Sequence, residues 1–420
     1  DYYNFFGGSA IALSDSDPID LTATSTKPSR LKRAVGTSKG LLMFAENSQF
    51  LLATTDIAFG PSTVKLTEIS NYSYTSKIKP LESGVSVIFS TEADTYSKVF
   101  EMALESIDNR PLVADNTRII PELIPPKLTI AATSPNNSFL AFGNGNNELF
   151  TFSFFNEGNN RTIAGWAIWE FPSDIKLFDF THDTSFTVMY NSTSNTHVLS
   201  RMEFLDDPET APISVYGSKF IPRLDNYIYN TDTTITTTGD VDKITFPSGF
   251  FVNNSTVYIM DSTQGISIRF FKYTPTLDTD GTYFIEVPSD LLDSGFIAGL
   301  SYNMLVKLPS FFVKDEKKSD RRNIPVCENV FLDMHLSGSV NVLLERLGYE
   351  DKSLTIAQPV ADVYLSDAPA ISDVLTDSIP VFCLGSLATL TISSDGPLPV
   401  ALSSYSWEGH YNNRGIISLD

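Results

Sequence analysis

Residues 40–54, GLLMFAENSQFLLAT, carry the pattern that most constrains the fold. Two apolar runs, residues 41–44 and 50–53, flank a polar tip at residues 46–48. This arrangement predicts a β-hairpin that is closed by a short turn. Because an isolated hairpin is only marginally stable, we expect further strands on its edges and another sheet on its apolar face.

Looser copies of this hairpin recur along the chain, and their spacing predicts the architecture. They span residues 85–102, 139–155, 186–204 and 250–271. The copies begin about 45 to 65 residues apart, close to the spacing of four-stranded blades in a β-propeller. No blade signature such as a repeated Trp-Asp pair accompanies them. A row of hairpins from two ordinary β-sandwiches is therefore the alternative.

Composition supports an all-β fold class. The chain has 30 Phe and 17 Tyr residues, and Ala-rich or Glu/Lys-rich helical runs are nearly absent, which favours strands. We predict a β-propeller of antiparallel blades over residues 1–287 and a C-terminal β-sandwich or platform region over residues 288–420. Residues 111–126 contain four prolines and are predicted to be an extended connector between blades. No apolar run reaches 18 residues, so no membrane-spanning helix is expected.

The charge is strongly acidic and unevenly distributed. The formal net charge is −21, and residues 353–413 contain no Lys or Arg. Such a surface repels a phosphate backbone, because affinity for nucleic acid comes from Lys and Arg. Tight DNA binding is therefore not expected, although DNA could pass along an acidic wall that does not hold it. The alternative is that the acidity serves only solubility.

An enzyme is the main rival class, and it would need catalytic or metal-binding groups. His182, His197, His335 and His410 form no HExxH pair, and no Gly-x-Ser-x-Gly occurs. Asp15, Asp17 and Asp20 lack the glycine and the distal Glu of a calcium loop. Cys327 and Cys383 are expected to be a reduced, buried pair. No catalytic, metal-binding or cofactor-binding site is predicted.

A glycan-binding or glycan-cleaving propeller remains the alternative function. Asp206-Asp207 and Asp278-Asp280 could in principle supply the two carboxylates that flank a glycosidic bond. The second pair is better explained as a hairpin turn. Trp166 and Trp169 are interpreted as core residues rather than a sugar platform.

Several strings resemble, in order and spacing, the nozzle proteins of short-tailed bacteriophages (podoviruses), also called tail tubular protein B. They are DYYNFF, SDSDPIDLTATSTKPSRL, GLLMFAENSQFLL, ISNYSYTSKIKPLESGVSVIF, YSKVFEM, RIIPELIP, AGWAIWEF, GLSYNMLVKLPSFF and SSDGPLPVALSSYSWEGHYNNRG. The resemblance covers nearly the whole chain. Family members are much longer on the N-terminal side, so the chain looks like their C-terminal portion.

The resemblance implies a structural protein of the virion that is assembled in the host cytoplasm. In the family, six copies form a homohexameric ring below the adapter (tail tubular protein A) ring. The ring contacts the tail fibres and encloses the channel through which phage DNA leaves without specific binding. Each subunit there carries a β-propeller and a platform region. The resemblance implies neither an enzyme nor a cofactor.

Two basic segments are candidate contact sites for such partners. The first is predicted to contact the adapter or another subunit, with a solvated turn as the alternative; it consists of Lys27, Arg30, Lys32 and Arg33. The second is a charged loop, interpreted as a solvated insertion or as a docking segment for fibre or adapter; its basic residues are Lys314, Lys317, Lys318, Arg321 and Arg322.

Overall fold

The computed structural model describes most of the chain as β-structure. The described residues are 19, 21–22, 28–54, 59–84, 86–104, 111–134, 138–157, 160–182, 184–192, 195–204, 213–215, 218–220, 222–247, 250, 256–261, 270–289, 295–315, 318–320, 325–357 and 372–410. Regular structure within them consists of strands and one 3-10 helix, η1 (Asn230–Asp232). The predicted all-β class is confirmed. No helix in these ranges is long and apolar enough to cross a membrane. The chain divides into two compact units, Asp1–Leu205 and Asp206–Asp420.

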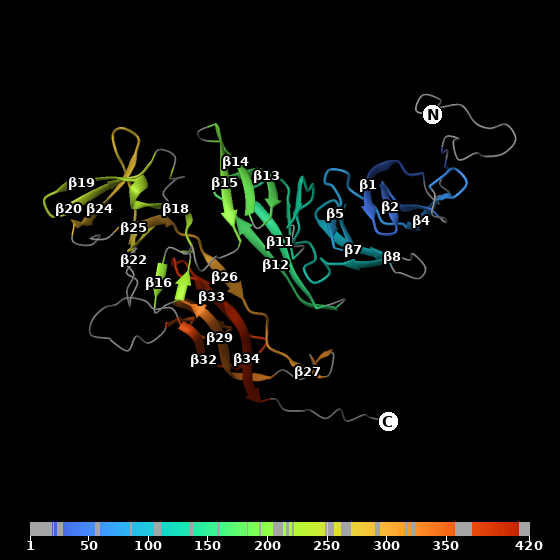
Figure 1. The fold of residues 1–420 in the computed structure, drawn as a ribbon. Coiled ribbons are helices and arrows are strands. Elements are labelled where there is room, and N and C mark those ends of the chain that lie inside the picture. Colours follow the sequence, from blue (N-terminus) through green and yellow to red (C-terminus); the bar gives the residue numbers. More distant parts are fainter. Residues whose placement is uncertain are drawn as a thin grey trace, which may run out of the picture. The chain divides into compact units, whose positions relative to one another are not determined.

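Unit 1 contains four antiparallel sheets that follow one another along the chain, from blue to green in Figure 1. The first two sheets comprise β1 (Leu31–Thr37), β2 (Gly40–Ala45), β3 (Gln49–Thr54) and β4 (Val64–Ser70), then β5 (Leu81–Ser83), β6 (Ser86–Glu92), β7 (Ser97–Leu104) and β8 (Pro111–Asp115). The next two comprise β9 (Ile130–Thr133), β10 (Phe139–Gly143), β11 (Glu148–Glu157) and β12 (Asn160–Glu170), then β13 (Asp174–Thr181), β14 (Thr184–Asn191) and β15 (Thr196–Glu203). Each sheet is a meander in which consecutive strands are neighbours.

The predicted hairpins of unit 1 are confirmed as strand pairs. β2 pairs with β3 with Leu42 opposite Leu51, and the Ala45 amide donates to the Ser48 carbonyl at 2.9 Å across the tip. The pairs β6–β7, β10–β11 and β14–β15 correspond to the next three copies. The predicted connector at residues 111–126 is wrong in its first part. That part forms β8, an edge strand that begins at Pro111, where the missing N–H breaks no inner ladder bond.

The four sheets of unit 1 pack face to face in series through three apolar cores. The first core joins sheets one and two through Val35, Leu42, Phe44, Tyr74, Val87, Phe89 and Met102. The second joins sheets two and three through Ile78, Leu81, Ile88, Val99, Ile124, Leu128, Leu140, Phe142, Phe150, Phe152 and Phe154. The third joins sheets three and four through Ile130, Ala132, Ala141, Leu149, Ile175, Phe178 and Phe180.

Strand β6 shows how the sequence produces this stacking. Val87 and Phe89 lie in the first core, and Ile88 lies in the second. Successive side chains of a strand point to opposite faces, so a continuous apolar run supplies both neighbouring sheets at once. Consecutive meander sheets packed face to face are consistent with propeller blades. Closure of these sheets around an axis stays a prediction.

Unit 2 contains two sheets that share one core. The first, in the order β18-β25-β21-β22, contains β18 (Asp225–Tyr229), β21 (Val257–Asp261), β22 (Phe270–Tyr273) and β25 (Phe296–Leu300). The second, in the order β19-β20-β24-β23, contains β19 (Thr234–Thr238), β20 (Val241–Thr245), β23 (Thr276–Leu277) and β24 (Tyr283–Pro288). Their core contains Ile244, Phe246, Phe250, Val257, Ile259, Ile285, Val287, Phe296 and Ala298. The fifth predicted hairpin is present in part, as β21 paired with β22.

The rest of unit 2 is a sandwich of two sheets, which confirms the β-sandwich predicted near the C-terminus. The sheets are β26-β33-β30-β31 and β32-β29-β34, with β26 (Met304–Lys307), β29 (Val326–Ser337), β30 (Val340–Arg346), β31 (Lys352–Ile356), β32 (Ser372–Leu384), β33 (Ala388–Ser394) and β34 (Leu402–His410). One core unites both sheets, including Leu332, Val342 and Leu390. Two small hairpins complete the unit, β16 (Ile213–Val215) with β17 (Ser218–Phe220) and β27 (Val313–Asp315) with β28 (Lys318–Asp320).

The domain boundary that we predicted after residue 287 stays a prediction. In the structure, β25 follows that position but pairs with β18 and β21, which precede it. Leu398, in the segment after β33, packs with Tyr258, Met260 and Ile297 of the same sheet. The strands on either side of residue 287 are therefore connected through one sheet and one core.

Candidate functional site

The first predicted contact segment lies at the exposed edge of sheet one. Arg30 directly precedes β1, and Lys32 and Arg33 lie in it; all three are exposed. Lys27 lies outside the described residues. Lys32 Nζ is 2.7 Å from Glu46 Oε1, and this hydrogen bond lowers the pKa of Glu46. Part of the basic charge is therefore offset locally, and a contact role for this edge stays a prediction.

Below this edge, Tyr74 anchors the first core. Its hydroxyl donates to the Ile78 carbonyl at 2.6 Å, and its ring lies 5.1 Å from that of Phe44. Burial raises the pKa of Tyr74 to about 12, although the Arg33 guanidinium acts in the opposite direction. The strand with the basic edge thus packs on a core with aromatic side chains, to which Val35 of β1 belongs.

The second predicted segment contains a hairpin where we expected a loop. Lys314 lies in β27 and Lys318 in β28, and the two strands pair with Asp315 opposite Lys318. Lys317, Arg321 and Arg322 lie outside the described residues. Whether this hairpin contacts a fibre or an adapter stays a prediction.

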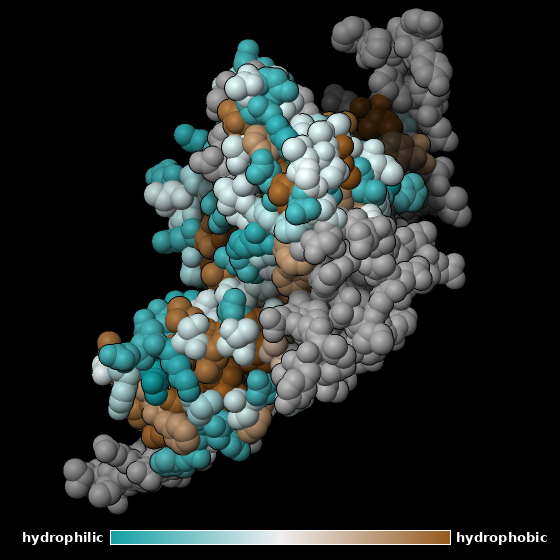
Figure 2. Space-filling view, turned by 90° about the vertical axis from the view of Figure 1, so that its left-hand side faces the viewer, coloured by the Kyte–Doolittle hydropathy of each residue, from teal (hydrophilic) through white to brown (hydrophobic). Residues whose placement is uncertain are grey.

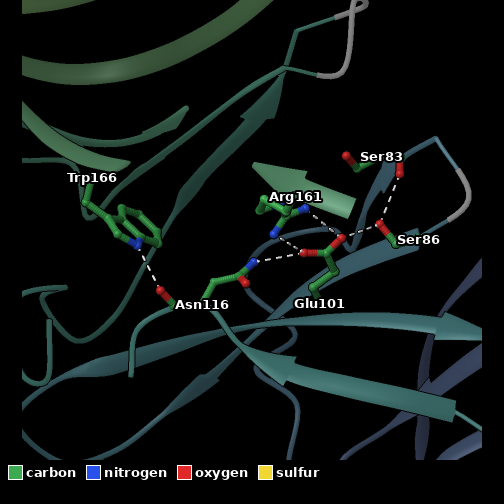
Figure 3. A network of polar contacts seen from close by, with 6 residues as sticks. All are labelled: Ser83, Ser86, Glu101, Asn116, Arg161 and Trp166. Atoms are coloured by element: carbon green, nitrogen blue, oxygen red, sulfur yellow. Dashed lines mark hydrogen bonds and ion pairs between the residues drawn. The ribbon is translucent and has the colours of Figure 1, made fainter. Parts of the chain in front are cut away.

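A polar network at the contact of sheets two and three was missed by the sequence analysis. Glu101 of β7 and Arg161 of β12 form a two-pronged ion pair, with Nη1 to Oε2 at 2.7 Å and Nη2 to Oε1 at 3.0 Å. Figure 3 shows Ser86 and Asn116 beside the same carboxylate, at 2.8 and 3.2 Å. Trp166 Nε1 donates to the Asn116 carbonyl at 2.9 Å.

The environment of this ion pair stabilises its charged form. Burial alone would raise the pKa of Glu101, but hydrogen bonds from Arg161, Ser86 and Asn116 and the charge of Arg161 hold that pKa below its usual value. The Arg161 guanidinium also lies 4.5 Å from the ring centre of Phe154. The pair fastens two sheets together, and nothing in it resembles an acid and base poised for catalysis. Glu101 and Arg161 are 60 residues apart, so no local sequence pattern could have revealed the pair. The one signal is the charge of Glu101 within the otherwise apolar residues 99–104 of β7.

A second polar arrangement covers the outer face of the sheet β32-β29-β34. Asp333 of the central strand accepts hydrogen bonds from Ser404 at 2.6 Å and Thr376 at 2.9 Å, which lower its pKa. Glu408 accepts a bond from Asn329 at 2.6 Å, and Glu328 lies 2.8 Å from a ring nitrogen of His410. The three strands contain no Lys or Arg. This face therefore presents carboxylates without cations from its own strands, and it would repel phosphate.

The residues considered for glycan chemistry have structural roles where they are described. Trp166 packs against the second core and Trp169 against the third, as predicted. Asp278 and Asp280 lie in the turn between β23 and β24, where Asp278 is paired with Lys243 and Asp280 accepts bonds from Thr282. Asp206-Asp207, like Asp15, Asp17 and Asp20, lies outside the described residues. A cleft in unit 2 has no carboxylate in its lining, which consists of Arg223, Tyr302, Met304, Ser394, Gly396, Leu398 and Val400.

The two cysteines are cross-strand neighbours inside the sandwich. Cys327 of β29 lies opposite Cys383 of β32, and both are buried and not joined by a disulfide. Burial raises the pKa of Cys327 to about 11. Within the described ranges, no three His, Cys, Asp or Glu residues are grouped to hold a metal ion. These thiols therefore belong to the packing of the core.

The stacked sheets, the ion pair between two of them and the sandwich define an all-β protein built of packed antiparallel sheets. The chain belongs to the bacteriophage nozzle protein family, whose model matches residues 1–416. Membership makes it a structural protein of the phage tail, and hence of the virion. The predicted family is therefore confirmed.

Comparison with curated proteins gives a distant relative. The chain is 21% identical over 430 residues to the tail tubular protein gp12 of Escherichia phage T7, a match that covers 98% of this chain and 52% of that protein. The chain thus spans about half the length of the curated relative it matches.

Two similar solved structures have low scores. The N-terminal domain of Nup159 has a TM-score of 0.26 at 11% identity, over 69% of this chain and 80% of that one. An exo-β-1,3-galactanase from Phanerochaete chrysosporium has a TM-score of 0.21 at 10% identity, over 79% and 95%. At these scores, neither similarity carries an argument about fold or activity.

Proposed function

We propose that the protein forms a ring that encloses the exit channel for phage DNA and acts as a wall without enzymatic activity. The observation that carries this proposal is the match to the nozzle family over residues 1–416. Three apolar cores in series support it, because closely packed interiors resist deformation. A ring of such subunits would resist the pressure of the passing DNA.

The charge supports the second part of the proposal, that DNA slides along the wall without sticking. The chain carries a net charge of −21, and the outer face of β32-β29-β34 has carboxylates but no cations of its own. A duplex would gain no counterion release by binding such a face. The genome would therefore move through the channel with little friction once a gate opens.

The partners of the ring are also proposals. We propose six copies, an adapter ring on one side and tail fibres on the outside. The basic edge at Arg30, Lys32 and Arg33 is the candidate for an adapter or subunit contact, and the β27–β28 hairpin is the candidate for a fibre or adapter contact. The first is exposed, and both segments are rich in charge, which suits contacts that are steered electrostatically.

Electron microscopy of the full-length protein tests the proposal directly. The purified protein, or tails isolated from particles, would be imaged and the mass of the assembly measured in parallel. We expect rings with a central hole and a mass that corresponds to six subunits. A measured mass that corresponds to a single subunit, or images of assemblies without a central channel, would contradict the proposal.

A further inference from the structure

One end of the C-terminal sandwich exposes large apolar side chains on two neighbouring turns. Leu347 and Tyr349, in the turn between β30 and β31, are 73% and 63% exposed. Leu384 and Leu387 flank the turn between β32 and β33, and Phe382 just before it is 64% exposed. Leu347, Tyr349, Phe382, Leu384 and Leu387 are called the turn patch below. In Figure 2, hydrophobic residues (brown) reach the surface of the lower part of the view, at the height of the sandwich in Figure 1.

Contacts between the turns make the turn patch one surface. The Leu347 amide donates to the Leu387 carbonyl at 3.1 Å, and the Leu387 amide donates to the Leu384 carbonyl at 2.8 Å. Arg346 Nη1 donates to the Val381 carbonyl at 3.2 Å, and its guanidinium lies 5.1 Å from the ring centre of Tyr349. The two sheets of the sandwich are thus tied together directly beneath the exposed side chains.

Folding does not explain these side chains. Turns favour Gly, Asn, Asp and Ser, and Gly348, with φ +89°, already supplies the left-handed residue of the β30–β31 turn. Phe382 adopts φ +45°, an unfavourable conformation for a residue with a side chain, and yet its ring is exposed. Exposed apolar clusters mark surfaces that bind another molecule.

We propose that the turn patch binds a second copy of the same chain as one side of the subunit contact in the ring. This inference rests on the ring proposed above. A basic partner would bind where the chain carries its many carboxylates, and not at the turn patch. Identical copies, each with a charge of −21, repel one another, and a surface without carboxylates lets two copies approach with the least repulsion. The turn patch has none, and Glu350 and Asp351 stand at its rim. Permanent interfaces have this apolar centre and polar rim.

A photo-crosslinking amino acid in place of Tyr349 tests this contact in assembled tails. We expect crosslinked products at twice the subunit mass, with the crosslinked peptide from the same protein. The matched control places the same group at Asn341, which is exposed at the opposite end of β30, and we expect it to give at least about 10-fold less product. Crosslinking from position 349 to a different tail protein, or none above the control, would overturn the inference.

A double substitution, Leu347→Asp with Tyr349→Asp, separates this inference from the proposed ring. Both side chains are exposed, so we expect the variant to fold with an unchanged thermal midpoint, while ring assembly weakens at least about 10-fold because carboxylates now face each other. If the wild type and the folded variant both form normal rings, the turn patch is not a subunit contact, while the proposal of a ring still holds. Absence of rings from the wild type would refute both. If the variant fails to fold, Tyr349→Ser gives the same readout with a smaller expected loss.

Discussion

At the scale of single residues, the Glu101–Arg161 pair is the clearest feature of the molecule. Both side chains are mostly buried, so neither can regain full hydration if its partner is removed. Exposed pairs such as Lys176 with Asp174 are screened by solvent and contribute little. The two kinds of pair therefore predict different costs for the same chemical change.

We expect Glu101→Gln to lower the free energy of unfolding by about 1 to 3 kcal/mol, because it leaves the Arg161 charge without its partner. Urea unfolding followed by tryptophan fluorescence measures this, since Trp166 belongs to the same network. Asp174→Asn is the matched control and should change the unfolding free energy by less than about 0.5 kcal/mol. Equal effects of the two substitutions would contradict the assigned role of the network.

The same pair predicts a dependence on pH. Because the pKa of Glu101 is lowered from its ordinary value of 4.5, the unfolded chain takes up a proton before the folded protein does, and folding loses stability as the pH falls below about 4.5. The difference in stability between wild type and Glu101→Gln should therefore be full near neutral pH and shrink on acidification. Unfolding midpoints of both proteins between about pH 7 and about pH 3 check this. A difference that grows with acid would show the sign to be wrong.

A third prediction concerns the thiol of Cys327. Its burial and its pKa of about 11 leave almost no thiolate near neutral pH, and the thiolate is the reactive form. We expect iodoacetamide at about pH 8 to leave Cys327 unmodified in the native protein and to modify it fully in guanidinium chloride. Mass spectrometry of the digested protein reads out both states. Rapid modification of the native protein would mean that the sandwich opens readily at this end.

At the scale of elements, the β1–β2 hairpin depends on one glycine. Gly40 has φ +138°, and a Cβ atom there would collide with the Leu52 carbonyl of the neighbouring strand. Gly36, in β1, has open space around it. Position 40, at the start of β2, thus requires glycine both for its positive φ and for the close approach of the Leu52 carbonyl. Position 36 in β1 has no such requirement.

Gly40→Ala should therefore destabilise unit 1 by more than about 1 kcal/mol, because alanine suffers both the strained φ and the collision. Gly36→Ala is the control, and it should be neutral or slightly stabilising because alanine restricts the unfolded chain more than glycine does. Thermal unfolding of the two variants beside the wild type measures the difference. Similar midpoints for both variants would contradict the hairpin geometry.

At the scale of the whole molecule, the proposed function makes charge the decisive property. Reversing charge on the outer face of β32-β29-β34 with Glu328→Lys and Glu408→Lys should give rings that retain duplex DNA at low salt and release it as salt is raised. The matched variant, Glu328→Gln with Glu408→Gln, removes the carboxylates without adding cations and should retain much less DNA. Filter retention over a salt series measures both. Equal retention by wild type and both variants would show that this face does not meet DNA.

The sequence by itself determined the local structure and the family. Alternation of apolar and polar residues has the period of a strand, so the hairpin at residues 40–54 and its copies could be identified from short windows. The acidic charge and the order of the recurring strings are likewise properties of the chain alone. Trp166 and Trp169 could be placed in the core because large aromatic side chains are seldom left in water.

Only the tertiary structure decided which faces meet. The pairing of Glu101 with Arg161, the burial of both faces of β6 and the meeting of the two turns at Leu347 and Leu387 join residues far apart in the chain. A strand pattern shows that a side chain is buried, but not against which sheet, because contacts between sheets depend on how the connecting segments fold back. For the same reason, the pattern of residues 111–115 could not distinguish a connector from the edge strand β8.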